Sequence, residues 1–284
     1  MQGFINVFKP SGVTSARVVA ILKKKYHLNK VGHMGTLDPM AEGVLPIAIG
    51  KATRMFDYFL SKTKCYRLKM KFGVDTDTLD ITGKVTHESD VIPTNNEIID
   101  VLPSFVGEIE QIPPVFSAKN IGGIRAYSLA RSGHDVQLKS CKVTINKLEF
   151  ISYADGELEL ICDCGSGTYI RSLVRDIASK LNTYATMTYL CRASSGNFNI
   201  ENSVDIEKFD GKLEDIVFPI TSIFSHISII NINKLDAQKL CNGLTIKTNI
   251  SDDICFAKCD NDLLGVAVMN NGMLKLKTYL KEEN

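Results

Sequence analysis

The chain has 284 residues and a mass of 31.4 kDa, a length typical of one large domain or two unequal ones. Hydrophobic residues make up 44% of it and charged residues 23%, so it can bury a core, which excludes a disordered, collagen-like or coiled-coil protein. The formal net charge of +1 is unevenly divided, because residues 1–71 contain thirteen Lys and Arg against three Asp and Glu. Such asymmetry indicates contact with nucleic acid or an acidic substrate, although a solvated lysine face explains it equally well.

The sequence predicts a cytoplasmic protein that does not contact a membrane. Its first ten residues lack the basic start and apolar run of a signal peptide, and the uncharged stretch at residues 216–233 is too rich in Ser, Thr, Pro and Asn for a membrane span. The eight Cys are expected to be reduced. Cys162-Asp163-Cys164 lacks the spacing of a zinc site, so no metal is expected.

Hydrophobic periodicity predicts helices and strands in the first half of the chain. A helix is expected from Ser15, as its N-cap, to the three lysines at 23–25. Residues 65–72 alternate between apolar and basic side chains, a pattern typical of a strand with one buried face. Thr94 and Glu97 have the spacing of a capping box at the start of another helix.

A proline-marked loop leads to a short segment at residues 127–131, and two more alternating strands follow, joined by a turn at Asp155-Gly156. Gly165-Ser166-Gly167-Thr168 then opens an amphipathic helix that carries Arg171 and Arg175 at least partly off its apolar stripe. That stripe consists of Ile170, Leu173, Val174, Ile177 and Leu181. Without a regular βαβ alternation, these elements predict an α+β fold with a mixed or antiparallel sheet.

After about residue 226 the chain becomes strand-like, with turn residues at Asp262, Asn270, Asn271 and Gly272. We therefore expect two domains, at residues 1–226 and 227–284, the second being small and β-rich.

The glycine-rich loop at residues 32–43 is the first candidate for a functional site. It contains one carboxylate, Asp38, on a segment whose glycines allow another backbone to approach closely. It matches neither phosphate-binding glycine motif, so an NTPase or a dinucleotide enzyme is not expected. A lone carboxylate can act as a nucleophile on sugars if an opposite charge keeps it ionised in a partly buried site, and Arg171 could supply that charge.

From the residues alone, plainer interpretations stay open. Asp-Pro is ordinary turn chemistry, and Arg171 could be a solvated arginine. Tyr66 would by default be a core residue and His33 a loop residue. Residues 75–80 begin like a calcium loop but lack its glycine and glutamate, so an acidic turn is expected there.

Five blocks, taken in order, resemble the TruB-type tRNA pseudouridine-55 synthases, and the similarity covers most of residues 1–200. The blocks are Lys9-Pro10-Ser11-Gly12-Val13-Thr14-Ser15, residues 32–45 around Asp38, Lys64-Cys65-Tyr66-Arg67, residues 111–118 with 126–127 and 130–133, and residues 165–173 around Arg171. The chain departs from the family pattern at Phe116, where Tyr is usual, and at Asn120, where Lys is frequent.

The resemblance implies a pseudouridine-synthase fold with a mixed, largely antiparallel central sheet flanked by helices, followed by a PUA-like RNA-binding domain. It implies that Asp38 is the nucleophile, that Arg171 pairs with it, and that Tyr66 stacks on the target uracil and assists proton transfer. Further implied roles are a uracil pocket completed by Tyr169 and Leu190, an RNA contact by His33, and support of the active-site loop by Lys9 and Pro10.

The implied activity is the isomerisation of uridine to pseudouridine in the T-loop of tRNA, by base flipping and attack of Asp38, with no cofactor and no metal. The implied partner is tRNA, with no obligatory protein partner and a monomeric chain. The basic residues of the first quarter, including Lys23–Lys25, Lys69 and Lys71, would then follow RNA phosphates. Two alternatives are an RNA-binding helper without catalysis and a guide-RNA-dependent relative. The resemblance leaves open whether Asp38 attacks C1′ or C6.

Overall fold

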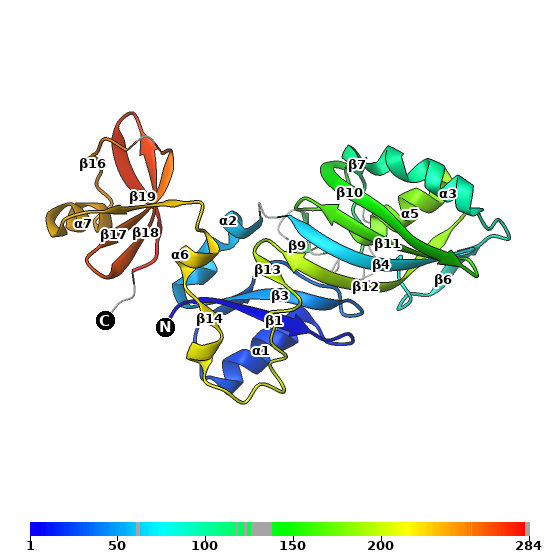
Figure 1. Cartoon of the computed structure of the whole chain (residues 1–284), viewed down its shortest axis with the longest axis horizontal. Helices are drawn as coiled ribbons and strands as arrows, with labels where there is room; N and C mark the ends of the chain where they lie inside the picture. Colours follow the sequence, from blue (N-terminus) through cyan, green and yellow to red (C-terminus); the bar gives the residue numbers. More distant parts are fainter. Residues whose placement is uncertain (61–62, 118, 122–123, 126–137, 251, 282–284) are drawn as a thin grey trace.

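The computed structural model describes residues 1–60, 63–117, 119–121, 124–125, 138–250 and 252–281. Two sheets dominate an elongated molecule, in which the C-terminal sheet lies at one end and the ten-stranded sheet extends from the middle to the other end (Figure 1). Within the described residues, none of the helices has the length and apolar character needed to cross a membrane. The segment at residues 127–131 and the side chain of Asn120 lie outside the described part of the chain.

The larger sheet has ten strands and contains the residues of the candidate site. Its strands are β1 (Gly3–Lys9), β2 (Val31–His33), β3 (Glu42–Ile49), β4 (Lys64–Phe72), β7 (Gly107–Gln111), β10 (Cys141–Ala154), β11 (Glu157–Cys164), β12 (Ala185–Ser195), β13 (Phe198–Asn199) and β14 (Val217–Phe218). Their order is β14-β1-β3-β12-β4-β11-β10-β7, with β2 paired to β3 and β13 to β12. The β3–β12 pair is parallel and the other pairs are antiparallel, as the predicted mixed, largely antiparallel sheet requires.

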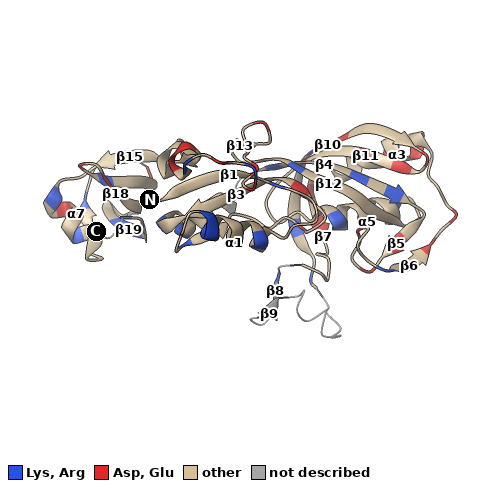
Figure 2. Cartoon of the chain, turned by 90° about the horizontal axis from the view of Figure 1, so that it is seen from below, with Lys and Arg blue, Asp and Glu red and all other residues tan. Residues whose placement is uncertain are grey.

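Short helices and two small strand pairs accompany this sheet. They are α1 (Ser15–Lys25), η1 (Gly50–Met55), α2 (Phe56–Leu60), α3 (Asn95–Val101), η2 (Leu102–Phe105), α5 (Ile170–Lys180), η3 (Leu213–Asp215), α6 (Ile220–Ile223), β5 (Val74–Thr76) with β6 (Val85–Glu88), and β8 (Asn120–Ile121) with β9 (Ile124–Arg125). Figure 2 shows α1 and α5 on one side of the sheet, and β8 and β9 projecting from that side.

Most of the local expectations agree with the structure. The capping box of Thr94 and Glu97 is present in α3, and Asp155 and Gly156, both at positive φ, form the turn between β10 and β11. The N-cap of α1 is Thr14, not Ser15 as expected, because the Thr14 hydroxyl accepts the backbone N–H of Arg17. The Ser15 hydroxyl is instead buried against the backbone of Leu37, so tertiary contact overrides its capping preference.

β4 lies near the middle of the large sheet and has the alternation predicted for it. Tyr66, Leu68, Met70 and Phe72 are buried on one face. Arg67 and Lys69 on the other face form ion pairs with Glu159 and Glu157 of β11. The basic face of this strand is therefore neutralised by carboxylates of its neighbour.

The C-terminal segment forms the second sheet. Its elements are β15 (Ser228–Asn231), α7 (Lys234–Cys241), β16 (Ile246–Lys247), β17 (Ile254–Cys259), β18 (Asp262–Asn270) and β19 (Met273–Tyr279), and the strand order is β15-β17-β18-β19-β16. This sheet begins close to the expected boundary at residue 226. The two sheets share a buried hydrophobic cluster, in which Phe256 and Leu280 pack with Phe4 and Phe59.

Candidate active site

A pocket of about 250 Å³ lies where the loop after β2, strands β4 and β12, and the start of α5 meet. Its lining includes Asp38, Tyr66, Tyr169, Arg171 and Leu190, five of the eight residues singled out in the sequence. The rest of the lining is Gly35, Thr36, Leu37, Phe56, Lys64, Ser117, Ser166, Gly167, Thr168, Ile170 and Arg192. Segments up to 157 residues apart in the chain thus contribute to one cavity.

Asp38 sits on residues 34–41, which we call the Asp38 loop. Hydrogen bonds from Ser11, Gly12 and Ser15 fix this loop on the side away from the pocket lining. The amide of Gly12 donates to the carbonyl of Pro39 at 2.8 Å, the Ser11 hydroxyl donates to the carbonyl of Met40 at 2.7 Å, and Ser15 exchanges hydrogen bonds with Leu37. The backbone around Asp38 is therefore set by hydrogen bonds that do not involve its side chain.

The structure brings Asp38 and Arg171 into direct contact. The Arg171 Nε atom lies 2.8 Å from one carboxylate oxygen of Asp38, and Nη2 donates to the other at 3.1 Å. This two-point arrangement is the strongest geometry available to an arginine and a carboxylate. The side chain of Arg171 is 6% exposed and that of Asp38 is 31% exposed, so the carboxylate retains access to the pocket.

The remaining donors of Arg171 are also used. Nη2 donates to the carbonyl of Phe116 at 2.8 Å and Nη1 to the carbonyl of Thr78 at 3.0 Å. Nη1 also lies 3.9 Å from a carboxylate oxygen of Asp80. Phe116, a departure from the family pattern, acts here through its backbone, so the substitution leaves this contact in place.

Burial raises the pKa of Asp38 above its usual value, and the second carboxylate at Asp80 raises it further. Arg171 and Lys9 oppose this, because their positive charges favour the ionised form. Arg171 is the larger of these two opposing influences. The guanidinium is therefore the group that chiefly preserves the charge of a carboxylate in a desolvated position.

Tyr66, Tyr169 and Leu190 form the walls of the pocket. Tyr66 is 7% exposed, and burial raises the pKa of its hydroxyl while the neighbouring Arg192 lowers it. Tyr169 is the N-cap residue of α5, and its backbone N–H donates to Gln111 at 2.8 Å. Leu190 pairs with Leu68 of the adjoining strand β4. Two aromatic rings and one aliphatic side chain thus line the pocket together with the carboxylate.

Lys9, Pro10 and His33 are not among the residues that line the pocket. Lys9 is fully buried, and its ammonium donates to the carbonyls of Pro10, Val13 and Pro39 at 2.6–3.3 Å. Burial lowers the pKa of Lys9 to about 8, against the opposing charge of Asp38. His33 lies on β2, opposite Ile47 of β3.

Arg192 is a site residue that the sequence reasoning missed. It is 1% exposed and donates to the carbonyls of Val44 at 2.7 Å and Gly35 at 3.1 Å. It reaches the Asp38 loop because β3 and β12 are parallel partners, with Gly43 opposite Arg192. A Cβ at Gly43, whose φ is +103°, would overlap the Arg192 carbonyl, which explains the glycine at this position.

Asp80 and Lys64 were also missed as site residues. Asp80 belongs to the segment expected to be an acidic turn, and it does form a turn by accepting hydrogen bonds from Thr78 and Thr82. Its burial next to Arg171 depends on the packing of that turn against α5, which no local pattern encodes. Lys64 stood in a family block, two residues before Tyr66, and that spacing on a strand was the available signal.

Two lysines of the expected phosphate track, Lys69 and Lys71 of β4, have partners within the protein. Lys69 and Lys71 lie on the face opposite Tyr66, where Lys69 contacts Glu157 and Lys71 donates to the carbonyl of Asp155. Since strand side chains alternate in direction, these lysines cannot face the pocket. The basic residues Lys23–Lys25 lie in the last turn of α1, away from β4 (Figure 2). Lys25 donates to the carbonyl of Ile206 at 2.9 Å.

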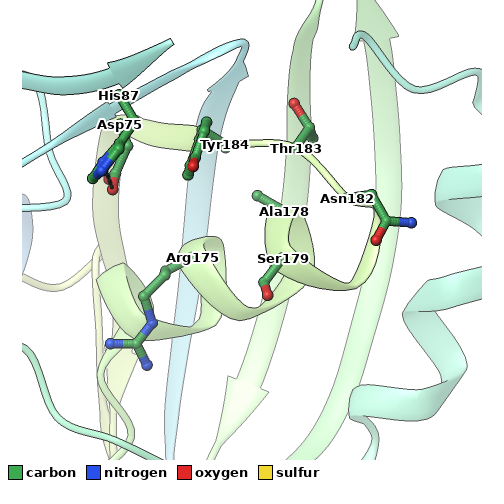
Figure 3. Close-up of a pocket in the computed structure, with 9 residues that line it drawn as sticks. Asp75, His87, Arg175, Ala178, Ser179, Asn182, Thr183 and Tyr184 are labelled. Atoms are coloured by element: carbon green, nitrogen blue, oxygen red, sulfur yellow. Dashed lines mark ion pairs between the residues drawn. The ribbon is translucent and has the colours of Figure 1, made fainter. Parts of the chain in front are cut away.

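A second groove, of about 400 Å³, runs beside the later turns of α5. Arg175 lines it one turn after Arg171, and the stacked rings of His87 and Tyr184, 5.0 Å apart, border it (Figure 3). Arg175 is already paired with Asp176 at 2.8 Å, and His87 lies 3.7 Å from Asp75. The guanidinium of Arg175 in this groove is therefore already compensated by a neighbouring carboxylate.

No group of three His, Cys, Asp or Glu side chains suited to a metal ion occurs in the part of the chain that the structure describes.

Residues 23–170 match the TruB family pseudouridylate synthase (N terminal domain). This segment is just over half of the chain, and it contains the Asp38 loop and β4. The chain therefore belongs to the TruB family of pseudouridylate synthases and is an enzyme of that class, as the sequence motifs predicted.

Curated relatives match over nearly the whole length. The chain is 39% identical to the tRNA pseudouridine synthase B of Clostridium perfringens (strain 13 / Type A) over 294 aligned residues, which cover 100% of both proteins. It is 43% identical to that of Clostridium tetani (strain Massachusetts / E88) over 87% of this chain and 86% of the relative. It is 38% identical to that of Aquifex aeolicus (strain VF5) over 99% of this chain and 100% of the relative.

Solved structures confirm the predicted fold class. A chain of an H/ACA RNP bound to a substrate RNA containing 2′-deoxyuridine is similar with a TM-score of 0.70 at 22% identity, over 99% of this chain and 85% of the other. A chain of a Cbf5-Nop10-Gar1 complex is similar with a TM-score of 0.69 at 26% identity, over 97% of this chain and 79% of the other.

Proposed function

We propose that this enzyme isomerises uridine to pseudouridine at position 55 in the T-loop of tRNA, with Asp38 as the nucleophile. The observation that carries the proposal is the Asp38 carboxylate, open to a small pocket, held at two points by Arg171 and bordered by Tyr66. The full-length relatives named tRNA pseudouridine synthase B support the choice of tRNA as substrate.

The substrate must enter this pocket as a single everted nucleotide. A uridine stacked within an RNA loop hides the ribose–uracil junction from a carboxylate, so the base has to leave the stack, at a cost of a few kcal/mol. Stacking on an aromatic side chain returns about 1–3 kcal/mol per base. Tyr66 is proposed to supply that stacking, and Tyr169 and Leu190 to complete the uracil pocket.

The reaction exchanges bonds without a change of redox state. The C1′–N1 bond breaks, the C1′–C5 bond forms, the proton on C5 leaves, and N1 takes up a proton. Asp38 forms a transient covalent bond to the nucleotide and is released when the new carbon–carbon bond is complete. Attack at C1′ and attack at C6 lead to the same product, with the same net bonds broken and formed. No cofactor enters this scheme, because no electrons are gained or lost.

Further assignments follow from position. Arg171 keeps Asp38 ionised, Tyr66 assists removal of the C5 proton, and Lys9 and Pro10 brace the Asp38 loop from behind. His33, on a neighbouring strand and outside the pocket lining, is proposed to contact RNA beside the everted nucleotide. Residues 227–284 are proposed to form a PUA-like RNA-binding domain. The enzyme is proposed to act as a monomer in the cytoplasm, without a guide RNA or an obligatory protein partner.

The test is release of tritium from unmodified tRNA transcript labelled at uridine C5, with no guide RNA and no other protein present. Asp38→Asn and Asp38→Ala should abolish release while tRNA binding changes little. Asp100→Asn, at an exposed position on α3, is the matched control and should behave as wild type.

Near-normal release by either Asp38 variant would remove Asp38 from the nucleophile role. Wild-type protein that binds the transcript without releasing tritium would favour the binding-helper alternative, and activity only with an added guide would favour the guide-dependent one.

A further inference from the structure

The pocket at Asp38 contains more positive charge than the proposed reaction uses. Its charged lining residues are Asp38, Lys64, Arg171 and Arg192, three cations for one anion. Asp80 lies 3.9 Å from Arg171 and balances one of these charges, so the lining side chains that the structure describes, taken with Asp80, carry a net positive charge. Arg171 is committed to Asp38, and Arg192 to carbonyls of β3 and the Asp38 loop.

Lys64 is the third of these cations. It is the first residue of β4, two residues before Tyr66, so both side chains leave the same face of the strand. It is 8% exposed, and its Nζ donates to the Ser166 hydroxyl at 3.2 Å. Ser166 and Gly167 line the same pocket. An ammonium, a hydroxyl and a glycine turn therefore meet on one wall.

Burial of the Lys64 ammonium lowers the free energy of unfolding, because a charged group loses its water on folding. Burial, together with the nearby charge of Arg192, lowers the pKa of Lys64 to about 8. A buried cation is costly to a protein and is ordinarily replaced by an apolar side chain with little loss of stability. An anion that enters the pocket would favour the charged form of Lys64, so anion binding would offset part of the cost of burying its ammonium.

The proposed substrate brings such an anion. An everted uridine remains linked to the RNA by a phosphodiester on each side, and these groups accompany the ribose to the pocket. Each phosphate is repelled by the Asp38 carboxylate toward which the ribose must move. A cation on the Tyr66 side of the pocket opposes that repulsion.

We propose that Lys64, with Ser166, binds a backbone phosphate adjacent to the everted uridine. This inference rests on the proposed function, since it assumes that the pocket receives a nucleotide of RNA. The contact positions the ribose against Asp38 and is formed on binding, so its loss should raise KM and Kd more than it lowers kcat.

The experiment pairs changes in the protein with changes in the RNA. The RNA is a T-arm hairpin with a single uncharged methylphosphonate linkage either 5′ or 3′ of the target uridine, compared with the all-phosphate hairpin. The proteins are wild type, Lys64→Met, Lys64→Arg and the control Lys69→Met, which removes a lysine from the opposite face of the same strand. Kd is measured by fluorescence anisotropy, and tritium release gives KM and kcat.

We expect Lys64→Met to raise Kd and KM for the all-phosphate hairpin by roughly tenfold to a hundredfold, as for the loss of a charged hydrogen bond. One of the two methylphosphonates should have a similar effect on wild type and almost none on Lys64→Met. Lys64→Arg should retain the sensitivity to that linkage, and Lys69→Met should match wild type. The thermal midpoint of Lys64→Met should not fall, because a buried charge has been removed.

The proposal would be overturned if, for both methylphosphonates, the increase in Kd caused by the linkage and the increase caused by Lys64→Met multiplied when the two changes were combined. Independent effects would mean that Lys64 contacts neither phosphate. The Kd measurements decide this whether or not the hairpin is turned over. Absence of tritium release by wild type would count against the proposed function, while the binding results would still report on Lys64.

Discussion

At the scale of single residues, Arg171 determines what Asp38 can do. Its guanidinium meets Asp38 at two points, reaches toward Asp80, and is held by the carbonyls of Thr78 and Phe116. These contacts leave it one orientation. Burial alone would protonate Asp38 more readily than is usual for an aspartate, so the ion pair makes nucleophilic chemistry feasible at neutral pH.

Arg171→Gln should reduce kcat/KM by about a hundredfold or more at pH 7 and change its pH dependence. The proposed nucleophile is the ionised carboxylate of Asp38, so activity should rise as pH passes upward through the pKa of Asp38. Arg171 lowers that pKa, and its loss must move the acidic limb of the pH–rate profile to higher pH. Measuring kcat/KM between pH 5 and about 9 tests this.

Arg171→Lys is the matched control, because it keeps the charge but loses the two-point geometry. Its acidic limb should stay closer to that of wild type although its activity is low. An unshifted acidic limb in Arg171→Gln would show that Arg171 does not govern the ionisation of Asp38.

Tyr66 combines a buried ring with a place on the pocket wall. Tyr66→Leu should lower kcat/KM by roughly tenfold to a hundredfold, because stacking on the uracil is lost, and circular dichroism should show a folded protein. Tyr66→Phe keeps the ring, so comparison of the two variants separates stacking from the contribution of the hydroxyl. Near-normal turnover of Tyr66→Leu would return Tyr66 to a purely structural role.

At the scale of elements, the site depends on how β3 and β12 meet. Their parallel pairing places Gly43 against Arg192, and Arg192 in turn holds the carbonyl of Gly35 in the Asp38 loop. The position of Asp38, the proposed nucleophile, is thus linked to a strand that lies about 150 residues away in the chain. That pairing involves only two residue pairs, so it depends strongly on close backbone approach.

Gly43→Ala should lower the free energy of unfolding by roughly 2–5 kcal/mol, because the added Cβ overlaps the Arg192 carbonyl at a backbone φ of +103°. Gly12→Ala is the control: its φ is +82°, but a Cβ there meets nothing within 4 Å, and we expect a loss of roughly 1–2 kcal/mol. Urea unfolding measures both. Equal losses would mean that backbone conformation, and not the β3–β12 contact, sets the cost.

Sequence patterns anticipated individual elements well and their contacts poorly. The buried face of β4, the capping box of α3 and the turn at Asp155 were predicted correctly, because each depends on residues within a few positions of one another. The N-cap of α1 was placed one residue too late, since a contact with Leu37 engages Ser15. The phosphate track on β4 stays a prediction, and the ion pair of Lys69 with Glu157 arises only in the sheet.

At the scale of the whole molecule, the two sheets are joined by a shared core. Phe256 and Leu280 of the C-terminal part pack in the cluster that contains Phe4 and Phe59. Polar contacts accompany it: Gln2 donates to the carbonyl of Leu280 at 2.9 Å. The C-terminal sheet is therefore expected to unfold together with the larger sheet.

Phe256→Ala should destabilise the protein by about 3–5 kcal/mol and lower the midpoint of a single thermal transition seen by calorimetry. Ile229→Ala, at an exposed position on β15 of the same sheet, is the control and should change the midpoint little. Two separate transitions, of which only the smaller responds to Phe256→Ala, would show that the sheets fold independently.

By itself, the sequence determined the α+β class, the family and the residues to suspect, because helix and strand periodicity and contiguous motifs are local properties of the chain. It also named both members of the Asp38–Arg171 pair. Only the tertiary structure decided that Asp80 adjoins Arg171, that Arg192 reaches the Asp38 loop, and that Lys64 faces the pocket while Lys69 faces away. These are relations between side chains brought together by strand pairing and helix packing, and their distances depend on the whole path of the backbone.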